Sequence, residues 1–512
     1  MYDVAVVGAG IAGMSTAARL QALGLSTIIF ESHSQPGGCA GFFCRRGFSF
    51  DVGATTLVDF DPGGVGGELL ESIGMPPLLG QSLKGYCAWL PDRKVLLHRD
   101  HGLWSEERLN AFGNSPKHRK FWHLIDRLAE VFWRASRCGI KLPVTSAGDL
   151  LNIVRSIGIG DLSLVRYLNW TMQDALNAHG LSLDRPLIGL LSMLIEDTVH
   201  STVSQAPLIN AALGITIRGA GLSRATGGMR GFWNRFSQHY ESLGGELLTR
   251  CRVNQITGTR GSFSLLTTKG EFGARQVVSA LPVQLTREIA PKAIGPRIAN
   301  KIDSPNFKTG GAIVVFLGVP EQEVSDIDND FTHHQLLQSY SEPLGNGNNM
   351  FISVSDSEDT GSAPNGYRSV MISTHCELES WQGLSPDEYA KQKNEIGEKL
   401  ITCANRAYPL LGTNPVVREV ATPLSYERFT RRPLGAVGGF RQNLRNSNQF
   451  SIPHESTLSG FWLAGDTTWP GLGTVAAVLG SRIVAECAFK LHRKLYRHQV
   501  PRLRIGFVEK NA

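Results

Sequence analysis

The sequence predicts an α/β fold in which a discontinuous Rossmann-like domain is joined to an α+β domain with a large helical part. Three observations lead to this prediction. A strand, a glycine-rich turn, a helix and a second strand follow one another within residues 3–31. Near the other end, residues 461–465 have a strand pattern and run into another glycine-rich turn and a helix. Between these ends, residues 103–217 carry apolar side chains at helical spacing.

The composition is that of a globular protein with a large core. The chain has 512 residues, of which 42% are hydrophobic and 19% charged, which excludes disorder and leaves room for two or more domains. The most apolar stretch, residues 186–217, is interrupted by Glu196, Asp197, His200 and Pro207, so we expect no transmembrane helix. No basic leader or apolar signal segment precedes the first strand, and we expect a cytoplasmic protein.

The cysteines and histidines do not indicate a metal site. Eight cysteines are scattered along the chain without a Cys-x-x-Cys pair, which favours reduced thiols. His333 and His334 are adjacent, so their side chains do not share one face of a helix or strand. We therefore expect no metal ion.

The first glycine-rich turn has the residues that a dinucleotide requires. Gly8 allows the tight turn after the strand, Gly10 lets the backbone approach a pyrophosphate, and Gly13 lets helix and strand pack closely. The N-terminus of the following helix presents free amides and a partial positive charge to the phosphates. Glu31 ends the second strand at about the spacing where an acid receives ribose hydroxyls. We predict a dinucleotide site here.

A second glycine-rich turn decides which dinucleotide is expected. Pro36-Gly37-Gly38-Cys39-Ala40-Gly41 follows the first unit, and Arg46 and Gly53 come shortly after it. Nicotinamide-dependent enzymes do not need this second turn, whereas a flavin dinucleotide stretched along the protein does. We therefore predict FAD as the cofactor, with Gly37, Gly38, Arg46 and Gly53 among the residues that bind it.

The turn near the C-terminus completes the predicted site. Gly465 and Asp466 end a strand, and an aspartate in this place can accept hydrogen bonds from ribityl or phosphate-side hydroxyls. Gly473, Thr474 and Val475 then open a helix, whose N-terminus can stabilise negative charge on a reduced flavin ring. A simple helix cap and turn is the alternative interpretation.

The layout predicts an FAD-binding domain assembled from residues 1–90, 221–290 and 416–512. Residues 91–220 would form a helical substrate region that can face a membrane, and residues 291–415 the sheet of the substrate domain. Within the second FAD-binding piece, residues 246–253 and 262–268 alternate in polarity and read as antiparallel strands.

The C-terminal tail is basic. Its charged residues are Lys490, Arg493, Lys494, Arg497, Arg502, Arg504 and Lys510 against the single acid Glu509. Such a tail can meet an anionic membrane surface, so we expect a peripheral protein on the cytoplasmic face of a membrane; a solvated tail is the alternative. Nucleic acid is not expected as a partner, because few aromatic residues interleave with these charges.

Together these motifs resemble the carotenoid desaturase and isomerase family of flavoproteins, of the bacterial phytoene desaturase type. The resemblance covers nearly the whole chain and is most specific at residues 4–31, 36–53, 227–229, 278–282, 422–423, 438–439 and 463–476. It implies non-covalent FAD, a two-domain fold and a lipid-like substrate bound between the flavin ring and a membrane-facing opening. It also implies that Val253 offers its backbone to the adenine and that Ala280 lies near the dinucleotide.

One departure separates the branches of this family. Phytoene desaturases and amine oxidases usually carry Arg after the second glycine of the second turn, where this chain has Cys39. Cys39 and residues 48–54 resemble the isomerase branch and the cyanobacterial 3′,4′-desaturase branch. Residues 333–336, 343–345, 351–353 and 428–432 are most similar to the latter. We therefore favour a carotenoid desaturase that forms a 3′,4′ double bond over a cis-trans isomerase.

The resemblance implies chemistry carried by the flavin. Neither C–H bond that a desaturase breaks is acidic, so the expected course is hydride loss to the flavin followed by proton loss to water or a weak base. No catalytic side chain is assigned. Glu196, Asp197 and His200 are candidates at the edge of the apolar run 187–195, although a helix cap or a surface ion pair is the commoner role. The run itself could line a substrate tunnel or simply form a buried helix.

Three alternatives to the desaturase remain. A carotenoid isomerase would use reduced FAD without net redox change. An amine oxidase is disfavoured because residues 422–439 contain no cysteine to tether FAD and no aromatic pair is recognisable. A non-catalytic prenyl-lipid escort protein of the same fold is disfavoured because Gly8, Glu31 and Asp466 are retained. Oxygen and a membrane quinone are both possible electron acceptors.

Overall fold

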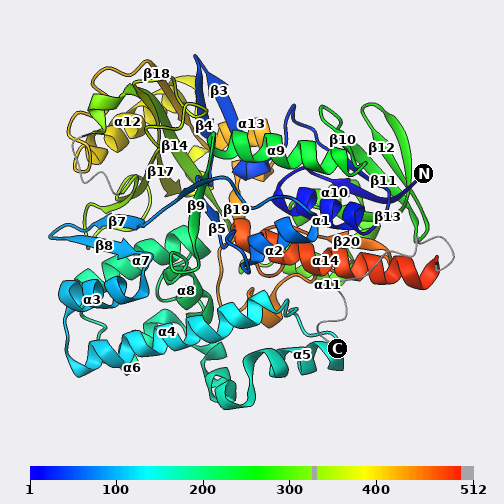
Figure 1. The fold of residues 1–512 in the computed structure, drawn as a ribbon, viewed down its shortest axis with the longest axis horizontal. Coiled ribbons are helices and arrows are strands. Elements are labelled where there is room, and N and C mark those ends of the chain that lie inside the picture. The colour runs from blue at the N-terminus through cyan, green and yellow to red at the C-terminus, as the bar shows by residue number, and fades with distance from the viewer. Residues whose placement is uncertain (326–330, 497–512) are drawn as a thin grey trace.

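The computed structural model describes residues 1–325 and 331–496, and its two large β-sheets lie side by side (Figure 1). The first sheet has seven strands in the order β10-β2-β1-β13-β12-β11, with β20 paired to β13. These strands are β1 (Tyr2–Val7), β2 (Thr27–Phe30), β10 (Glu246–Leu248), β11 (Val253–Thr259), β12 (Ser262–Thr267), β13 (Gly270–Ser279) and β20 (Phe461–Leu463). Segments from the start, the middle and the end of the chain thus build one sheet, as a discontinuous Rossmann-like domain requires.

The centre of the first sheet is parallel and covered on both faces. β1 pairs in parallel with β2 and β13, and β13 with β20. Val4 and Val6 of β1 belong to one hydrophobic cluster, whereas Ala5 and Val7 belong to another on the opposite face. Because both faces are buried, the strand is a continuous apolar run.

Helices cover each face of this sheet. α1 (Ile11–Ala22) and α14 (Thr474–Leu495) pack against each other, beside α2 (Val65–Ser72) and α9 (Gly228–Ser242). α10 (Val283–Ile289) and α11 (Pro296–Ile302) lie with the other cluster. The prediction for residues 246–253 was wrong in part, because β10 runs parallel to β2. A helix, α9, precedes it, and a strand delivered by a helix returns in parallel.

The second sheet has eight strands in the order β18-β14-β17-β16-β15-β7-β8, with β19 paired to β14. They are β7 (Gly85–Trp89), β8 (Lys94–His98), β14 (Thr309–Pro320), β15 (His333–Leu337), β16 (Asn349–Val354), β17 (Tyr367–Cys376), β18 (Val417–Ala421) and β19 (Val437–Phe440). α12 (Pro386–Ala404) covers one face, and α13 (Pro423–Thr430) follows β18. A capping box at Ser385 and Glu388 begins α12.

The predicted domain boundaries therefore need correction at two places. β7 lies within the predicted piece 1–90, and β18 and β19 lie within the predicted piece 416–512, yet all three belong to the second sheet. Their apolar alternation fits either sheet, and only the long-range pairings with β14 and β15 decide between them.

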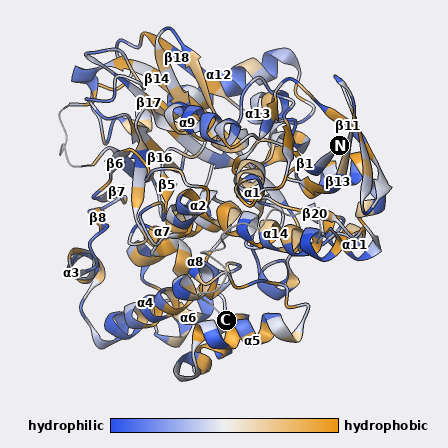
Figure 2. Cartoon of the chain, turned by 45° about the vertical axis from the view of Figure 1, so that its right-hand side comes forward, coloured by the Kyte–Doolittle hydropathy of each residue, from blue (hydrophilic) through white to orange (hydrophobic). Residues whose placement is uncertain are grey.

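A layer of helices lies below the second sheet in Figure 1. It contains α3 (His101–Phe112), α4 (Pro116–Arg137), α5 (Ala147–Ile157), the 3-10 segment η2 (Ile159–Asn169), α6 (Met172–Ala178), α7 (Arg185–Val199) and α8 (Leu208–Ile215). This confirms the helical prediction for residues 103–217, apart from the turns. α4 carries hydrophobic residues on one side and hydrophilic ones on the other (Figure 2). The leucines of α7 pack into the hydrophobic core, as expected of a buried helix. Among the described residues, no helix is both long and apolar enough to span a bilayer.

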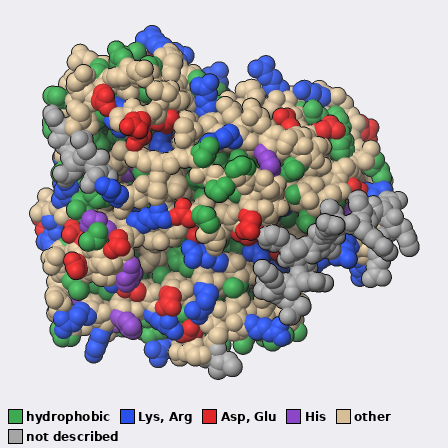
Figure 3. Space-filling model, in the orientation of Figure 1, with side chains coloured by type: hydrophobic (Ala, Val, Ile, Leu, Met, Phe, Trp, Pro, Cys, Tyr) green, Lys and Arg blue, Asp and Glu red, His purple; other side chains and the backbone are tan. Residues whose placement is uncertain are grey.

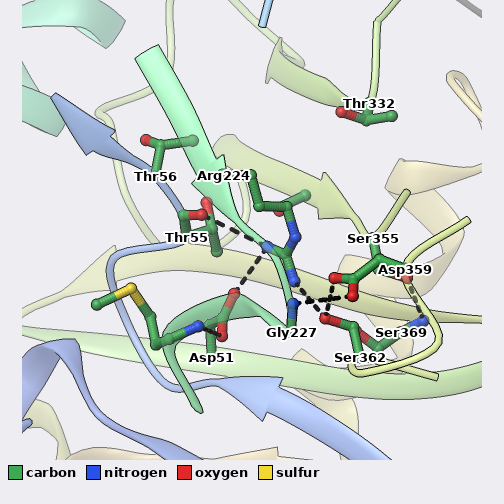
Figure 4. A network of polar contacts seen from close by, with 12 residues as sticks. Asp51, Thr55, Thr56, Arg224, Gly227, Thr332, Ser355, Asp359, Ser362 and Ser369 are labelled. Atoms are coloured by element: carbon green, nitrogen blue, oxygen red, sulfur yellow. Dashed lines mark hydrogen bonds and ion pairs between the residues drawn. The ribbon is translucent and has the colours of Figure 1, made fainter. Parts of the chain in front are cut away.

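A buried polar network joins the two halves of the molecule (Figure 4). The hairpin β3 (Phe42–Arg45) and β4 (Phe48–Asp51) and the small sheet of β5 (Leu57–Val58), β6 (Gly80–Ser82) and β9 (Leu222–Ala225) lie between the large sheets. Arg224 Nη1 lies 2.7 Å from Asp51 Oδ2, and Met229 N donates to Asp51 Oδ1 at 2.8 Å. Arg224 also donates to Ser362 Oγ, and burial raises the pKa of Asp51. The network ties the segment after the second glycine-rich turn to the loop before β17.

Candidate functional site

The first glycine-rich turn has the predicted geometry. Gly8 has a φ of 99°, which favours glycine. A Cβ on Gly13 would lie 2.0 Å from Gly8 O, so only glycine lets α1 approach the end of β1 this closely. A Cβ on Gly10 would meet no atom within 4 Å. The N-terminus of α1 therefore borders open space, where its free amides can bind an anion.

Glu31 is held at the same turn. Its Oε2 accepts from Ala9 N at 2.8 Å, and its Oε1 accepts from His33 N at 2.7 Å. Each carboxylate oxygen has two lone pairs, so both oxygens can accept a further hydrogen bond. The structure thus places Glu31 beside the first turn, where the sequence predicted a ribose acceptor.

The second glycine-rich turn packs directly on the first. Gly37 N donates to Ala9 O at 2.9 Å, and a Cβ on Gly38 would lie 3.4 Å from Gly10 Cα. A Cβ on Gly53 would lie 2.4 Å from Cys39 O, which explains a glycine at that position as well. The two turns and Gly53 form one surface.

Three other residues between positions 1 and 280 were predicted to bind the cofactor: Ala280, Val253 and Arg46. The first two lie at this surface and Arg46 does not. Ala280 N donates to Val7 O at 2.9 Å, and its Cβ would be 3.1 Å from a Cβ on Gly13. Val253 is buried, two residues after Cys251, whose amide donates to the carbonyl of Glu31. Arg46 is exposed in the turn between β3 and β4, where Nη1 donates to Val416 O at 3.0 Å. The structure does not bring Arg46 to the others, because the hairpin carries it away from the turn.

The C-terminal segment closes the site from the other side of β13. Ala464 N donates to Ser279 O at 2.9 Å, which places Gly465 and Asp466 next to Ala280. Gly473 precedes α14 with a φ of 98°, and a Cβ there would meet no atom within 4 Å. Thr474 and Val475 form the first turn of α14. A second helix N-terminus with open space in front of it therefore belongs to the site.

Arg432 belongs to the segment 428–432 that carries the family resemblance, but it was not predicted as a residue of the cofactor site. Its Nη2 lies 2.7 Å from Asp466 Oδ1 and its Nη1 lies 2.8 Å from Asp466 Oδ2, an ion pair with two parallel contacts. Nη1 also lies 3.4 Å from Cys39 Sγ. Burial acts to lower the pKa of Arg432, but the charge of Asp466 outweighs it, and the pKa lies above its ordinary value. The guanidinium thus stands beside the position where the related sequences usually carry an arginine.

These residues fit an extended dinucleotide such as FAD. Open space lies in front of two helix N-termini, at Gly10 and Gly473, as bound phosphates or a flavin ring would need. Arg432 Nε is buried and has no hydrogen-bond partner among the described residues, so the site contains a donor in need of an acceptor. Asp466 and Glu31 supply acceptors for hydroxyl groups at the two sides of the site.

A second polar group lies between α7 and the second sheet. Glu196 accepts from Asn349 Nδ2, and its Oε2 lies 3.8 Å from His375 Nδ1. The rings of His200 and His375 have centroids 4.6 Å apart. His200 is the C-cap of α7, which is one of the two roles expected for it. Glu196 pairs with His375 in a half-buried place, so the expectation of a surface ion pair was wrong for this residue. The partners from β16 and β17 were missed because they are far away in the sequence.

Asp197 belongs to the same region. Its Oδ2 accepts from Gln335 Nε2 at 3.1 Å, and burial raises its pKa. The residue is nevertheless exposed. Among residues 1–325 and 331–496, no group of three or more His, Cys, Asp or Glu side chains is placed to hold a metal ion.

The fold and the site together define a flavin-dependent oxidoreductase: a Rossmann-like sheet with two glycine-rich turns that pack on each other, and a second large sheet beside it. The chain belongs to the family described as flavin containing amine oxidoreductase, whose sequence profile matches residues 11–488. Membership of this family implies FAD.

Comparison with characterised proteins shows distant homology to carotenoid enzymes. Prolycopene isomerase 2 of an Oncidium hybrid cultivar is 25% identical over 96% of this chain and 85% of its own. The lycopene-forming phytoene desaturase of Pseudescherichia vulneris is 22% identical over 95% of this chain and 98% of its own. The chain is thus a distant homologue of prolycopene isomerases and phytoene desaturases.

Solved structures share the fold. Putrescine oxidase bound to putrescine aligns with a TM-score of 0.64 at 15% identity and covers 96% of this chain and 99% of that one. An oxidoreductase from Methanosarcina mazei aligns with a TM-score of 0.63 at 17% identity, over 94% of this chain and 100% of that one. This confirms the α/β fold of the FAD-dependent amine oxidases and shows the fold alone.

Proposed function

We propose that the protein is an FAD-dependent carotenoid desaturase that forms the 3′,4′ double bond. The observation that carries the proposal is the coincidence of a dinucleotide site with homology to carotenoid enzymes along nearly the whole chain. The residues that resemble the 3′,4′-desaturase branch support the finer assignment, among them Cys39 and the segment 428–432 that leads to Arg432.

The chain's own residues would hold the cofactor and position the substrate. The amides at the N-termini of α1 and α14 would bind phosphate and flavin groups, while Glu31 and Asp466 would accept from hydroxyls. When bound, FAD supplies the two-electron acceptor, which oxygen or a quinone then restores. We expect non-covalent binding, since residues 422–439 contain no cysteine. The apolar residues of the second sheet and of α7 would help to exclude water from a bound substrate.

A carotenoid cis-trans isomerase is the second candidate, because the four prolycopene isomerases among the relatives are 24–25% identical to this chain. The proposal favours the desaturase because residues 333–336, 343–345, 351–353 and 428–432 resemble the 3′,4′-desaturase branch more than the isomerase branch.

Two further candidates have less support. Putrescine oxidase is only 15% identical to this chain, and similarity at that level does not support an amine substrate here. A non-catalytic lipid escort needs no dinucleotide site, whereas here open space lies at Gly10 and Gly473.

The product of the reaction tests the proposal. The protein is expressed in a pigment-free bacterium supplied with monocyclic carotenoid precursors, then purified, and the absorption of the protein and of the extracted pigments is recorded. We expect a flavin spectrum together with a pigment red-shifted by one conjugated double bond. Pigment changed only in its cis-trans form would favour the isomerase, and the absence of flavin would contradict both.

We also propose that the protein binds the cytoplasmic face of a membrane through α5 and η2. Exposed apolar side chains gather there: Leu150, Leu151, Leu162, Val165 and Leu168. Arg155 and Arg166 are exposed beside them, and lysine and arginine side chains lie along the lower part of Figure 3, over the helical layer. Apolar and basic side chains together favour an anionic lipid surface. Of the basic tail, residues 497–512 lie outside the described residues.

Co-sedimentation with anionic liposomes tests this surface. Leu150 and Leu151 are 55% and 50% exposed, and replacing both with Glu should weaken binding by about tenfold or more, because apolar burial is lost and negative charge is added. Leu183→Glu is the control, since Leu183 is 91% exposed outside this surface. Equal binding of the control and the double variant would contradict the assignment.

A further inference from the structure

His200 is held against the dinucleotide site by an unusual backbone conformation. It follows the last residue of α7 with a φ of 49° and a ψ of 42°, in the left-handed region. A Cβ on Gly438 would lie 2.6 Å from His200 Cε1, so the glycine at this position of β19 leaves room for the imidazole. Non-glycine residues in this conformation are found at functional sites more often than elsewhere.

Gly438 connects the imidazole to the site described above. Its carbonyl accepts from Arg432 Nη2 at 3.0 Å, and a Cβ on the next residue, Gly439, would lie 1.8 Å from Asp466 O. The imidazole of His200 therefore lies on one side of β19, and the pair of Arg432 and Asp466 lies next to the same two glycines. A bound flavin at Asp466 and the histidine would be close neighbours.

A charged pair stands behind His200. The ring of His375 packs edge-on against the ring of His200, with 65° between their planes, and His375 Nδ1 faces the carboxylate of Glu196 at 3.8 Å. Asn349 donates to the same carboxylate and so holds it in place. The contacts lead from β19 through two imidazoles to a half-buried acid, and they join β19, the end of α7 and β17.

Two buried polar atoms in this group have no partner among the described residues. They are His200 Nδ1 and Gln335 Oε1. A buried polar atom without a hydrogen bond costs free energy, about 1–3 kcal/mol. Such atoms are retained where a substrate, a water molecule or a transferred proton takes the missing place.

We propose that His200 accepts the proton that the substrate loses, and that His375 and Glu196 hold it in position. This rests on the proposed desaturase function. One C–H bond of the substrate breaks and its hydride goes to the flavin, whose electrons pass to oxygen or a quinone. The neighbouring C–H bond breaks, its electron pair forms the new C=C bond, and its proton binds a lone pair of the His200 imidazole. From there the proton can pass to solvent.

The electrostatic surroundings suit this role. Burial, followed by the charge of His375, lowers the pKa of His200 well below its ordinary value, so the imidazole is neutral with a free lone pair. Burial also acts on His375, but Glu196 outweighs it and raises the pKa of His375. The charged or titratable groups that face His200 are His375 on β17, Glu196 and Asp197 on α7, and Arg432 and Arg441 on either side of β19.

Two variants test the proposal without disturbing the backbone. His200→Gly keeps the left-handed conformation, since glycine adopts it freely, and opens a space of the size of an imidazole. His200→Asn keeps a polar side chain that tolerates the same conformation. His179→Asn is the matched control, because His179 is a half-buried histidine that ends α6 in the same helical layer.

Turnover is measured on the FAD-loaded protein with its carotenoid. General acid-base groups contribute about 10²–10⁴-fold to rate, so kcat should fall at least about 100-fold in both variants, with KM, flavin content and thermal midpoint unchanged. Imidazole added to the His200→Gly variant should restore turnover, an effect that a purely structural role would not produce. The proposal would be overturned if both variants kept a kcat within threefold of the wild-type value. It would also be overturned if imidazole did not restore the activity lost in His200→Gly. In either case, desaturation by the wild-type protein would leave the proposed function intact.

A second readout does not depend on the substrate. Burial lowers the pKa of His200 well below its ordinary value, so the flavin absorption of the wild-type protein should change on the acid side of about pH 6.5, where His200 gains its proton, and the His200→Asn variant should lose that change. A flavin spectrum without pH dependence in the wild type would overturn the placement of His200 beside the flavin. A wild type that shows the titration but converts no carotenoid would overturn the proposed function instead.

Discussion

Replacing Arg432 with Met should destabilise the protein and weaken FAD binding, because the change leaves Asp466 as a carboxylate without a counter-ion. The side chain of Arg432 is 10% exposed and that of Asp466 is 20% exposed. At a contact of 2.7 Å and an effective dielectric constant of about 20, two unit charges attract by about 6 kcal/mol. Desolvation offsets part of this attraction, and breaking a buried pair costs about 3–5 kcal/mol. Since Asp466 keeps some contact with water, we expect the lower end, about 3 kcal/mol.

Urea unfolding and FAD titration by flavin fluorescence measure the two effects. Arg432→Met should lower the free energy of unfolding and weaken FAD binding by at least about tenfold, since an unpaired negative charge then stands where an anionic cofactor must bind. Arg431→Met is the control, because Arg431 is the exposed neighbour in the sequence; surface changes of this kind stay within about 0.5 kcal/mol.

The double variant Arg432→Met with Asp466→Asn decides whether the pair is the cause. If it is, the second substitution should recover about 2 kcal/mol of the loss from the first, because contacting residues are non-additive. Additive losses, or an Arg432→Met variant as stable as the control, would refute the reasoning.

Three further predictions concern the same two regions. Gly13→Ala would bring a Cβ to 2.0 Å from Gly8 O, so it should destabilise the turn by about 1–3 kcal/mol and lower the flavin content measured per protein. Acid precipitation should release all FAD from the wild type and from Cys39→Ser alike; flavin retained only in the wild-type pellet would show a covalent bond. The pKa of His375 is raised in the folded protein, so its pairing with Glu196 stabilises the fold fully below about pH 6.5. This stabilisation is lost as the pH rises through the pKa that His375 has in the folded protein. The difference in urea midpoint between wild type and His375→Gln should shrink from pH 6 to 9, and a constant difference would contradict it.

The residues of the first turn could be predicted because the signal is local. Gly8, Gly10, Gly13 and Glu31 lie within one strand-turn-helix-strand unit, whose short range leaves one way to fold it. The structure brings all four together, and it brings Gly37 and Gly38 to the same place through a hydrogen bond to Ala9. The prediction for Arg46 was wrong. Arg46 lies close to the second glycine-rich turn in the sequence, but the β3–β4 hairpin carries it away from that turn in space.

Arg432 and His375 show what such patterns leave out. Each is placed by a strand pairing between distant segments: β19 with β14 for the segment after Arg432, and β17 with β14 for His375. The sequence shows that β14 and β17 are apolar strands, but a buried strand fits several neighbours equally well, so it does not show which side chains will meet. His200 illustrates the consequence. As a residue at the end of a helix it reads as a cap, and only the glycine opposite it in β19, 238 positions away at Gly438, makes room for its ring beside the flavin site. The chemistry that distinguishes members of a fold therefore depends most on the long-range contacts that local pattern cannot supply.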